Sequence, residues 1–317
     1  MTLDTLLTGI GVLSPLGGKE PFFAAFEQGL PAPAADLHDA GAQGLVDRLG
    51  IKNPKLRIAR YMDPVSKNAI VALEDAMADA GITAEAVAAD PCGFAIVLGV
   101  TRGPAATREK AYEQLRAREG RLLSGTLFSN VGYNIAAATT AMAHGIKGPN
   151  LTVAGRSNLS IHVFRRARQL LAARRVHTVF AGFSECLPYQ EGGPSRLREW
   201  ACIFSLERAD RVRQRGATGG LALAEIELAP PEPPTRFSPG RALRLPLPLP
   251  QPLSPAALAA AEPVDLELAD PLGTGPEHLP LIQAGRLKAT HVREENAYVA
   301  FPVVTRTGIS LLGVAWV

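Results

Sequence analysis

The chain has 317 residues, of which 47% are hydrophobic and 20% are charged, as in ordinary globular proteins. Its net charge of +3 is too small to indicate a nucleic-acid partner. Cys92, Cys186 and Cys202 lack the spacing of a metal site or a disulfide framework. No signal peptide and no membrane-length apolar run stands out. We therefore expect a cytoplasmic protein that binds neither nucleic acid, membrane nor metal.

The N-terminal quarter predicts a strand, a short helix, a loop and a long helix. Residues 6–18 are apolar and run into a Gly-rich turn whose spacing is not that of a phosphate-binding G-x-G-x-x-G motif. Residues 21–29 suit a short helix, and the Ala- and Asp-rich residues 31–50 suit a surface loop. Residues 63–81 begin with Asp-Pro and end with Gly, which predicts a helix with both of its ends marked.

The middle of the chain alternates strands and helices. Residues 93–103 predict a buried strand, and residues 107–120 and 135–144 predict helices. Residues 150–181 predict a strand, a sharp turn over 155–158, a helix from 161 to 175 and a second buried strand. A residue on a strand-to-helix turn is exposed at the positive end of the helix dipole, where nucleophiles are often placed. Ser157 occupies that turn and is a candidate functional residue.

The last third predicts mostly strands. Cys202 is expected to be a buried residue of a strand. Residues 227–255 contain so many prolines that we expect a linker or extended surface arm, and neither a helix nor a central strand. Further strands are predicted over residues 264–268, 297–304 and 309–317.

Several of these segments resemble β-ketoacyl synthases of the thiolase-like fold. Residues 8–17, TGIGVLSPLG, resemble the opening of that family. Residues 148–153, GPNLTV, and 181–185, AGFSE, resemble the strands on either side of its nucleophile turn. The resemblance implies an α/β, thiolase-like layered αβαβα fold with a truncated C-terminal half.

The resemblance also implies that the chain divides into three parts and that it lacks the family's nucleophilic sulfur atom. We expect a thiolase-like half over residues 1–228, a Pro-rich linker over 229–256 and a reduced C-terminal half over 257–317. The nucleophilic Cys of the family falls on Ser157, and the small residue before it falls on Arg156. Leu272 stands where active synthases place a catalytic His before a G-T-G sequence.

A scaffold without the nucleophile is similar to the chain-length factors of type II polyketide synthases. Such a subunit pairs with an active ketosynthase, shapes its acyl tunnel, works on acyl carrier protein and needs no cofactor. By that resemblance Pro104, Thr107, Ala111 and Phe128 line the tunnel, unless their helix packs on its own core instead. Two alternatives stay open: an acyltransferase or hydrolase that uses Ser157 as nucleophile, and a degenerate scaffold that only stabilises a partner.

Overall fold

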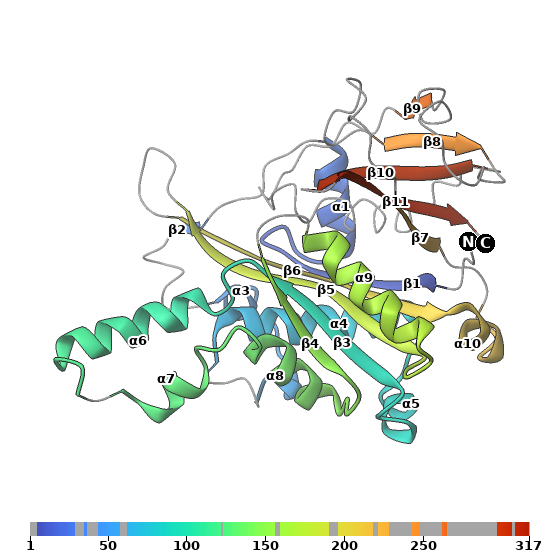
Figure 1. Cartoon of the computed structure of the whole chain (residues 1–317). Helices are drawn as coiled ribbons and strands as arrows, with labels where there is room; N and C mark the ends of the chain where they lie inside the picture. Colours follow the sequence, from blue (N-terminus) through green and yellow to red (C-terminus); the bar gives the residue numbers. More distant parts are fainter. Residues whose placement is uncertain are drawn as a thin grey trace.

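The structure is a computed structural model built around one mixed sheet of eleven strands (Figure 1). The strand order is β4-β3-β5-β6-β1-β7-β11-β10-β8-β9, and β2 pairs with β6 off this path. The structure describes residues 5–28, 35–36, 44–57, 62–121, 123–155, 159–189, 196–217, 221–227, 242–246, 262–264, 297–305 and 308–316. Ser157 and Leu272 lie outside these described residues.

The strands are parallel at one end of the sheet and antiparallel elsewhere. β3 pairs in parallel with both β4 and β5, and every other pairing is antiparallel. The strands are β1 (Thr5–Leu13), β2 (Ala35–Asp36), β3 (Phe94–Val100), β4 (Asn150–Ala154), β5 (Thr178–Tyr189), β6 (Arg196–Arg208), β7 (Leu221–Glu227), β8 (Ala242–Pro246), β9 (Glu262–Val264), β10 (Ala297–Thr305) and β11 (Gly308–Trp316).

Helices cover both faces of the sheet. The α-helices are α1 (Lys19–Gln28), α3 (Leu45–Arg48), α4 (Pro64–Ala80), α5 (Ala84–Ala89), α6 (Ala105–Ala117), α7 (Gly125–Ser129), α8 (Ile135–His144), α9 (Leu159–Ala172) and α10 (Ala209–Gln214), and η1 (Pro54–Arg57) is a 3-10 helix. Alternate residues of β3 point to opposite faces because side chains alternate along a strand. Ala95 and Val97 join the core under α1 and α9, while Ile96 and Leu98 join the core under α4 and α8.

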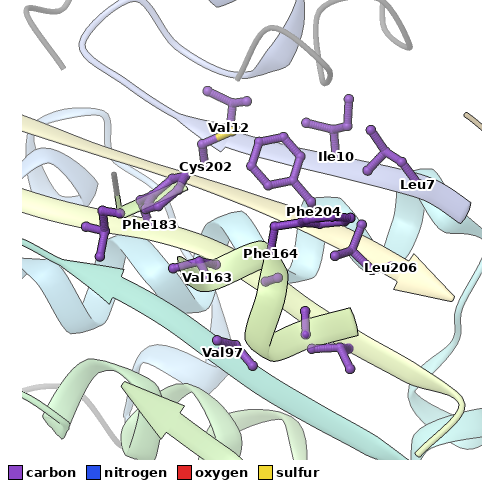
Figure 2. Close-up of a cluster of buried hydrophobic side chains, with 14 of the residues drawn as sticks. Leu7, Ile10, Val12, Val97, Val163, Phe164, Phe183, Cys202, Phe204 and Leu206 are labelled. Atoms are coloured by element: carbon purple, nitrogen blue, oxygen red, sulfur yellow. The ribbon is translucent and has the colours of Figure 1, made fainter. Parts of the chain in front are cut away.

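The core beneath α9 is dense in aromatic and branched side chains (Figure 2). Val163 and Phe164 of α9 pack into a cluster with Phe183 of β5 and Phe204 of β6. All four side chains are fully buried. The described residues thus form helix, sheet and helix layers around one sheet, which confirms the α/β class expected from the sequence.

Two glycines of the first motif allow α4 to lie directly on β1. A Cβ atom at Gly9 would meet the backbone carbonyl of Ala76, and one at Gly11 would meet that of Ala72. Helix α4 contacts β1 more extensively than it contacts any other element. The T-G-x-G pattern is therefore explained by close packing of a helix on a strand.

The ends of α4 follow the sequence prediction. The Asp63 carboxylate accepts a hydrogen bond from the Val65 amide at 3.1 Å, and Pro64 occupies the first helical position. Gly81 ends the helix with a φ of 66°, in the left-handed region that glycine tolerates. The predicted strand over residues 150–154 and the predicted helix over residues 135–144 also have the expected bounds.

Two stretches differ from the prediction. The expected surface loop over residues 31–50 contains β2 and α3, and Leu45 and Val46 of α3 are buried. The Pro-rich stretch contains β8, which pairs with β10 on one side and β9 on the other and is therefore not an edge strand. Residues 242–245, ALRL, are free of proline, so only the last residue of β8 lacks an amide donor.

The described C-terminal strands extend the first sheet. β7 pairs with the first residues of β1. On its other side the sheet continues through β11, β10, β8 and β9. Figure 1 shows these strands stacked beyond β1, on the side away from β4. In the part of the chain that is described, the C-terminal residues add strands to the existing sheet.

Candidate functional site

The carboxyl ends of the three parallel strands meet at one edge of the sheet. The amide of Gly155, directly after β4, donates a hydrogen bond of 3.2 Å to the carbonyl of Val100 at the end of β3. Helix α9 begins four residues after Gly155. Ser157 lies outside the described residues, but chain connectivity places it between these two points. In open α/β sheets, ligands bind at this carboxyl edge.

A buried carboxylate fixes the end of β3 at this edge. Glu185 of β5 is fully buried. Its Oε1 accepts from the Thr101 amide at 2.6 Å, and its Oε2 accepts from the Thr101 hydroxyl at 3.0 Å. Charge-assisted bonds of this length are stronger than neutral ones, so Glu185 locks the turn that leads from β3 towards α6.

A second buried carboxylate joins two helices. Asp63, which caps α4, also accepts from the amide of Thr107 in the first turn of α6 at 2.9 Å. The side chain is almost completely buried, and this burial raises the pKa of the Asp63 carboxyl although both amide bonds oppose the rise. One side chain therefore satisfies orphan N–H groups of two helix N-termini and ties α6 to the body of the fold.

A third buried carboxylate pairs with α3. Arg48 Nη2 lies 2.6 Å from Glu199 Oε2, and the Glu199 side chain is buried. Burial raises the pKa of the Glu199 carboxyl even though Arg48 opposes the rise. The Cys186 thiol donates to Glu199 Oε1 at 3.5 Å. This pair explains why α3 is held against the sheet and is not part of a loop.

The two buried cysteines are poor candidates for a nucleophile. Burial raises the pKa of the Cys186 thiol well above its ordinary value, and burial likewise raises the pKa of Cys202. Both side chains are fully buried, and the thiolate is the reactive form of cysteine. Cys202 lies in β6 as the sequence predicted.

The four residues assigned to the tunnel lie in two different environments. Pro104, Thr107 and Ala111 are buried at the base and on the inner face of α6. Phe128, on α7, is 68% exposed. The structure thus brings the first three together on one side of α6 and places Phe128 at the surface. Their part in a tunnel remains a prediction.

Exposed apolar side chains are concentrated in one segment. Among the described residues, every exposed large hydrophobic side chain except Leu49 belongs to what we call the 112–151 apolar surface, which comprises Tyr112, Phe128, Tyr133, Met142 and Leu151. These residues come from α6, α7, α8, β4 and the turn before α8. Within the described strands β4 pairs only with β3, so it forms an edge of the sheet beside this surface.

Of the three described histidines, His162 lies in the first turn of α9 at the carboxyl edge and the other two lie elsewhere. His144 ends α8 and His177 precedes β5, so both lie toward the amino ends of the parallel strands. His162 is exposed on α9. Within the described ranges no cluster of three or more His, Cys, Asp or Glu side chains could hold a metal ion, and no helix is long and apolar enough to cross a membrane.

Residues 48–197 match the family model described as "Beta-ketoacyl synthase, N-terminal domain". This stretch of the chain is therefore similar to that domain. The matched range contains α4, the parallel strands, α9 and the three buried carboxylates. The carboxyl edge described above therefore lies within the part of the chain that is similar to this domain.

Two curated relatives of the domain are similar over part of the chain. The 3-oxoacyl-[acyl-carrier-protein] synthase 1 of Haemophilus influenzae is 25% identical over 199 residues, which are 59% of this chain and 47% of the relative. The 3-oxoacyl-[acyl-carrier-protein] synthase 2 of Coxiella burnetii is 24% identical over 233 residues, which are 68% of this chain and 54% of the relative. The chain thus spans about half the length of these relatives.

Solved structures share the fold at lower identity. A β-ketoacyl synthase from Burkholderia phymatum superposes with a TM-score of 0.61 at 14% identity and covers 99% of both chains. "The ishigamide ketosynthase/chain length factor" gives a TM-score of 0.54 at 18% identity, covering 69% of this chain and 63% of that one. A type II ketosynthase bound to its acyl carrier protein gives 0.56 at 17% identity, covering 72% of this chain and 71% of that one.

Sequence reasoning missed most of the network that supports this edge. It identified Asp63 as a helix start but not as the acceptor for α6, and it identified Glu185 only as part of a motif. It placed Arg48 in a loop and assigned Glu199 no role. A charged residue inside an apolar strand pattern, as at Glu185 and Glu199, is the sequence signal that could have identified both, because such residues are rarely buried without partners.

Proposed function

We propose that this chain is a non-catalytic chain-length factor that pairs with an active ketosynthase. The observation that carries the proposal is the 112–151 apolar surface beside the unpaired edge of β4. Edge strands and large exposed apolar areas require cover in a folded protein. A partner of the same fold supplies both a matching strand and a matching apolar area. The ketosynthase/chain length factor structure cited above, similar in fold, is itself described as such a pair.

The residues at the nucleophile turn support a non-catalytic role. Claisen condensation needs a thiolate to carry the acyl chain and donors that stabilise the developing oxyanion. Ser157 offers a neutral hydroxyl that needs a paired base, and the adjacent Arg156 cannot accept a proton. Leu272 stands in place of a His. The catalytic groups would therefore come from the partner, which works on acyl carrier protein.

The proposed pairing places Phe128 at the contact with the partner. Its ring is the most exposed large hydrophobic side chain described, and it lies on the short helix α7. Aromatic side chains at the centre of an interface commonly contribute most of its binding energy. Thr107 and Ala111 are buried on the inner face of α6, so they would affect the tunnel by setting the position of that helix.

Binding to a co-expressed full-length ketosynthase of the same organism tests the pairing. We expect a heterodimer by size-exclusion chromatography with light scattering. Phe128→Ser should weaken the dimer tenfold or more, about the loss expected for an interface aromatic. Leu49→Ser is the matched control, because Leu49 is also exposed but lies in α3's C-terminal cap, away from the 112–151 apolar surface. Equal weakening by both variants, or no complex with the wild-type chain, would contradict the proposal.

Intact mass spectrometry separates this proposal from catalysis by Ser157. We expect no covalent adduct when the purified chain is incubated with an acyl carrier protein thioester. A stable acyl adduct on the wild type that disappears in Ser157→Ala would instead establish the acyltransferase or hydrolase alternative. A third outcome is possible. If the chain forms the heterodimer and shows no adduct, and the ketosynthase makes products of the same length with and without it, the chain is a scaffold that only stabilises its partner.

A further inference from the structure

A pocket rich in arginine lies at the far end of α9. Its walls are the last turns of α9 and the corner where β6 passes into α10. Arg168 and Arg174 line it from the first side, and Arg208 and Arg213 line it from the second. The single carboxylate in the lining is Asp210. Four guanidinium groups around one carboxylate leave a strong local excess of positive charge.

Asp210 compensates only part of this positive charge. It accepts a bidentate pair of hydrogen bonds from Arg208, both 2.9 Å long, and lies 3.9 Å from Arg174 Nη1. The hydrogen bonds from Arg208 lower the pKa of the Asp210 carboxyl, so it stays ionised. In the part of the chain that the structure describes, the guanidinium groups of Arg168 and Arg213 make no ion pair or hydrogen bond.

The backbone at Arg174 is unusual for its residue type. Its φ is 52°, in the left-handed region, and the other described non-glycine residue with positive φ is Glu119. Glycine is the residue that ordinarily occupies this conformation just after a helix. The chain keeps an arginine there at an energetic cost, and the side chain of that arginine lines the pocket. Backbone strain of this kind is typical of positions whose side chain has a function.

We propose that this pocket binds a phosphate monoester dianion. Guanidinium groups bind phosphate oxygens in pairs through a rigid fork of donors, and Arg168 and Arg213 are free to do so. The site is separate from the nucleophile turn, since the 14 residues of α9 span about 21 Å between them. The proposal is independent of the pairing with a ketosynthase. The phosphate could belong to a soluble metabolite or to a lipid headgroup.

Titration calorimetry of the full chain with inorganic phosphate and pyrophosphate, at constant ionic strength, tests the site. We expect saturable binding that Arg213→Gln weakens about tenfold, the loss expected for a charge-assisted hydrogen bond. Arg166→Gln is the matched control, because it removes the same charge from α9 outside the pocket. Absence of binding, or equal weakening in both variants, would overturn the proposal.

Two further measurements exclude a purely structural role and identify the source of the phosphate. Arg174→Gly should raise the urea midpoint by relieving the left-handed strain, while it weakens phosphate binding about tenfold. A lower midpoint with unchanged binding would show that Arg174 serves only the helix end and would overturn its place in the site. Co-sedimentation with phosphatidic acid vesicles that pyrophosphate reverses would assign a lipid headgroup. Pyrophosphate binding without co-sedimentation would assign a soluble phosphate.

Discussion

Removal of the Asp63 carboxylate should loosen two helices at once. The side chain accepts from Val65 in α4 and from Thr107 in α6, at 3.1 and 2.9 Å. Loss of one N-cap costs about 1 kcal/mol, and a buried N–H left without an acceptor costs about 1–3 kcal/mol. Relief of the desolvated carboxylate, whose pKa burial raises, offsets part of this. We expect Asp63→Ala to lower the free energy of unfolding by about 2–3 kcal/mol.

Urea unfolding at pH 7 measures this change, and Thr83→Ala is its control. Thr83 caps α5 by accepting from the Ala86 amide at 3.2 Å, but it is exposed and serves one helix only. Its removal should cost about 0.5–1 kcal/mol. Hydrogen exchange should additionally show faster amide exchange in α6 for Asp63→Ala alone. If the two variants lose equal stability, or if α6 keeps its protection, the double-cap reasoning is refuted.

Close packing and a buried histidine give two further predictions. Gly11→Ala should cost about 3 kcal/mol or more in urea unfolding, because the new methyl would meet the Ala72 carbonyl, whereas Gly125→Ala, in open space, should not destabilise the protein. Burial lowers the pKa of His144 to about 4, so the unfolded state gains a proton first as pH falls below 6.5. The free energy of unfolding should therefore fall by up to about 3 kcal/mol between pH 6.5 and 4. His144→Gln should make this fall smaller. If the variant shows the same dependence of unfolding free energy on pH as the wild type, His144 is not its cause.

Local signals predicted those elements whose ends are set by their own residues. The ends of α4 were predictable because Asp63 and Gly81 act within one turn of the helix. The existence of α3 was not, because it depends on an ion pair between Arg48 and Glu199, which are 151 residues apart. β8 was missed for the same kind of reason, since its partner strand β10 begins more than 50 residues later and the surrounding prolines dominate the composition.

The candidate site shows the same division between local and distant causes. The strand-turn-helix pattern predicted β4, α9 and β5, because the alternation of strand and helix is a local property. The Glu185 bonds to Thr101 cross from β5 to the end of β3, and no spacing in the sequence specifies that contact. The sequence therefore indicated the resemblance to a family, but it did not predict which side chains hold the carboxyl edge of the sheet in place.

The supporting network bears on the proposed loss of the nucleophile, because it does not depend on that residue. Asp63 and Glu185 fix the helix and strand ends around the turn through backbone amides. None of these bonds uses a side chain of the turn between β4 and α9. Under the proposed function, Ser157 in place of a nucleophilic Cys would remove the reactive thiolate and leave these printed bonds of Asp63 and Glu185 intact. Selection on catalysis can be lost while selection on shape continues, which is the condition that a chain-length factor requires.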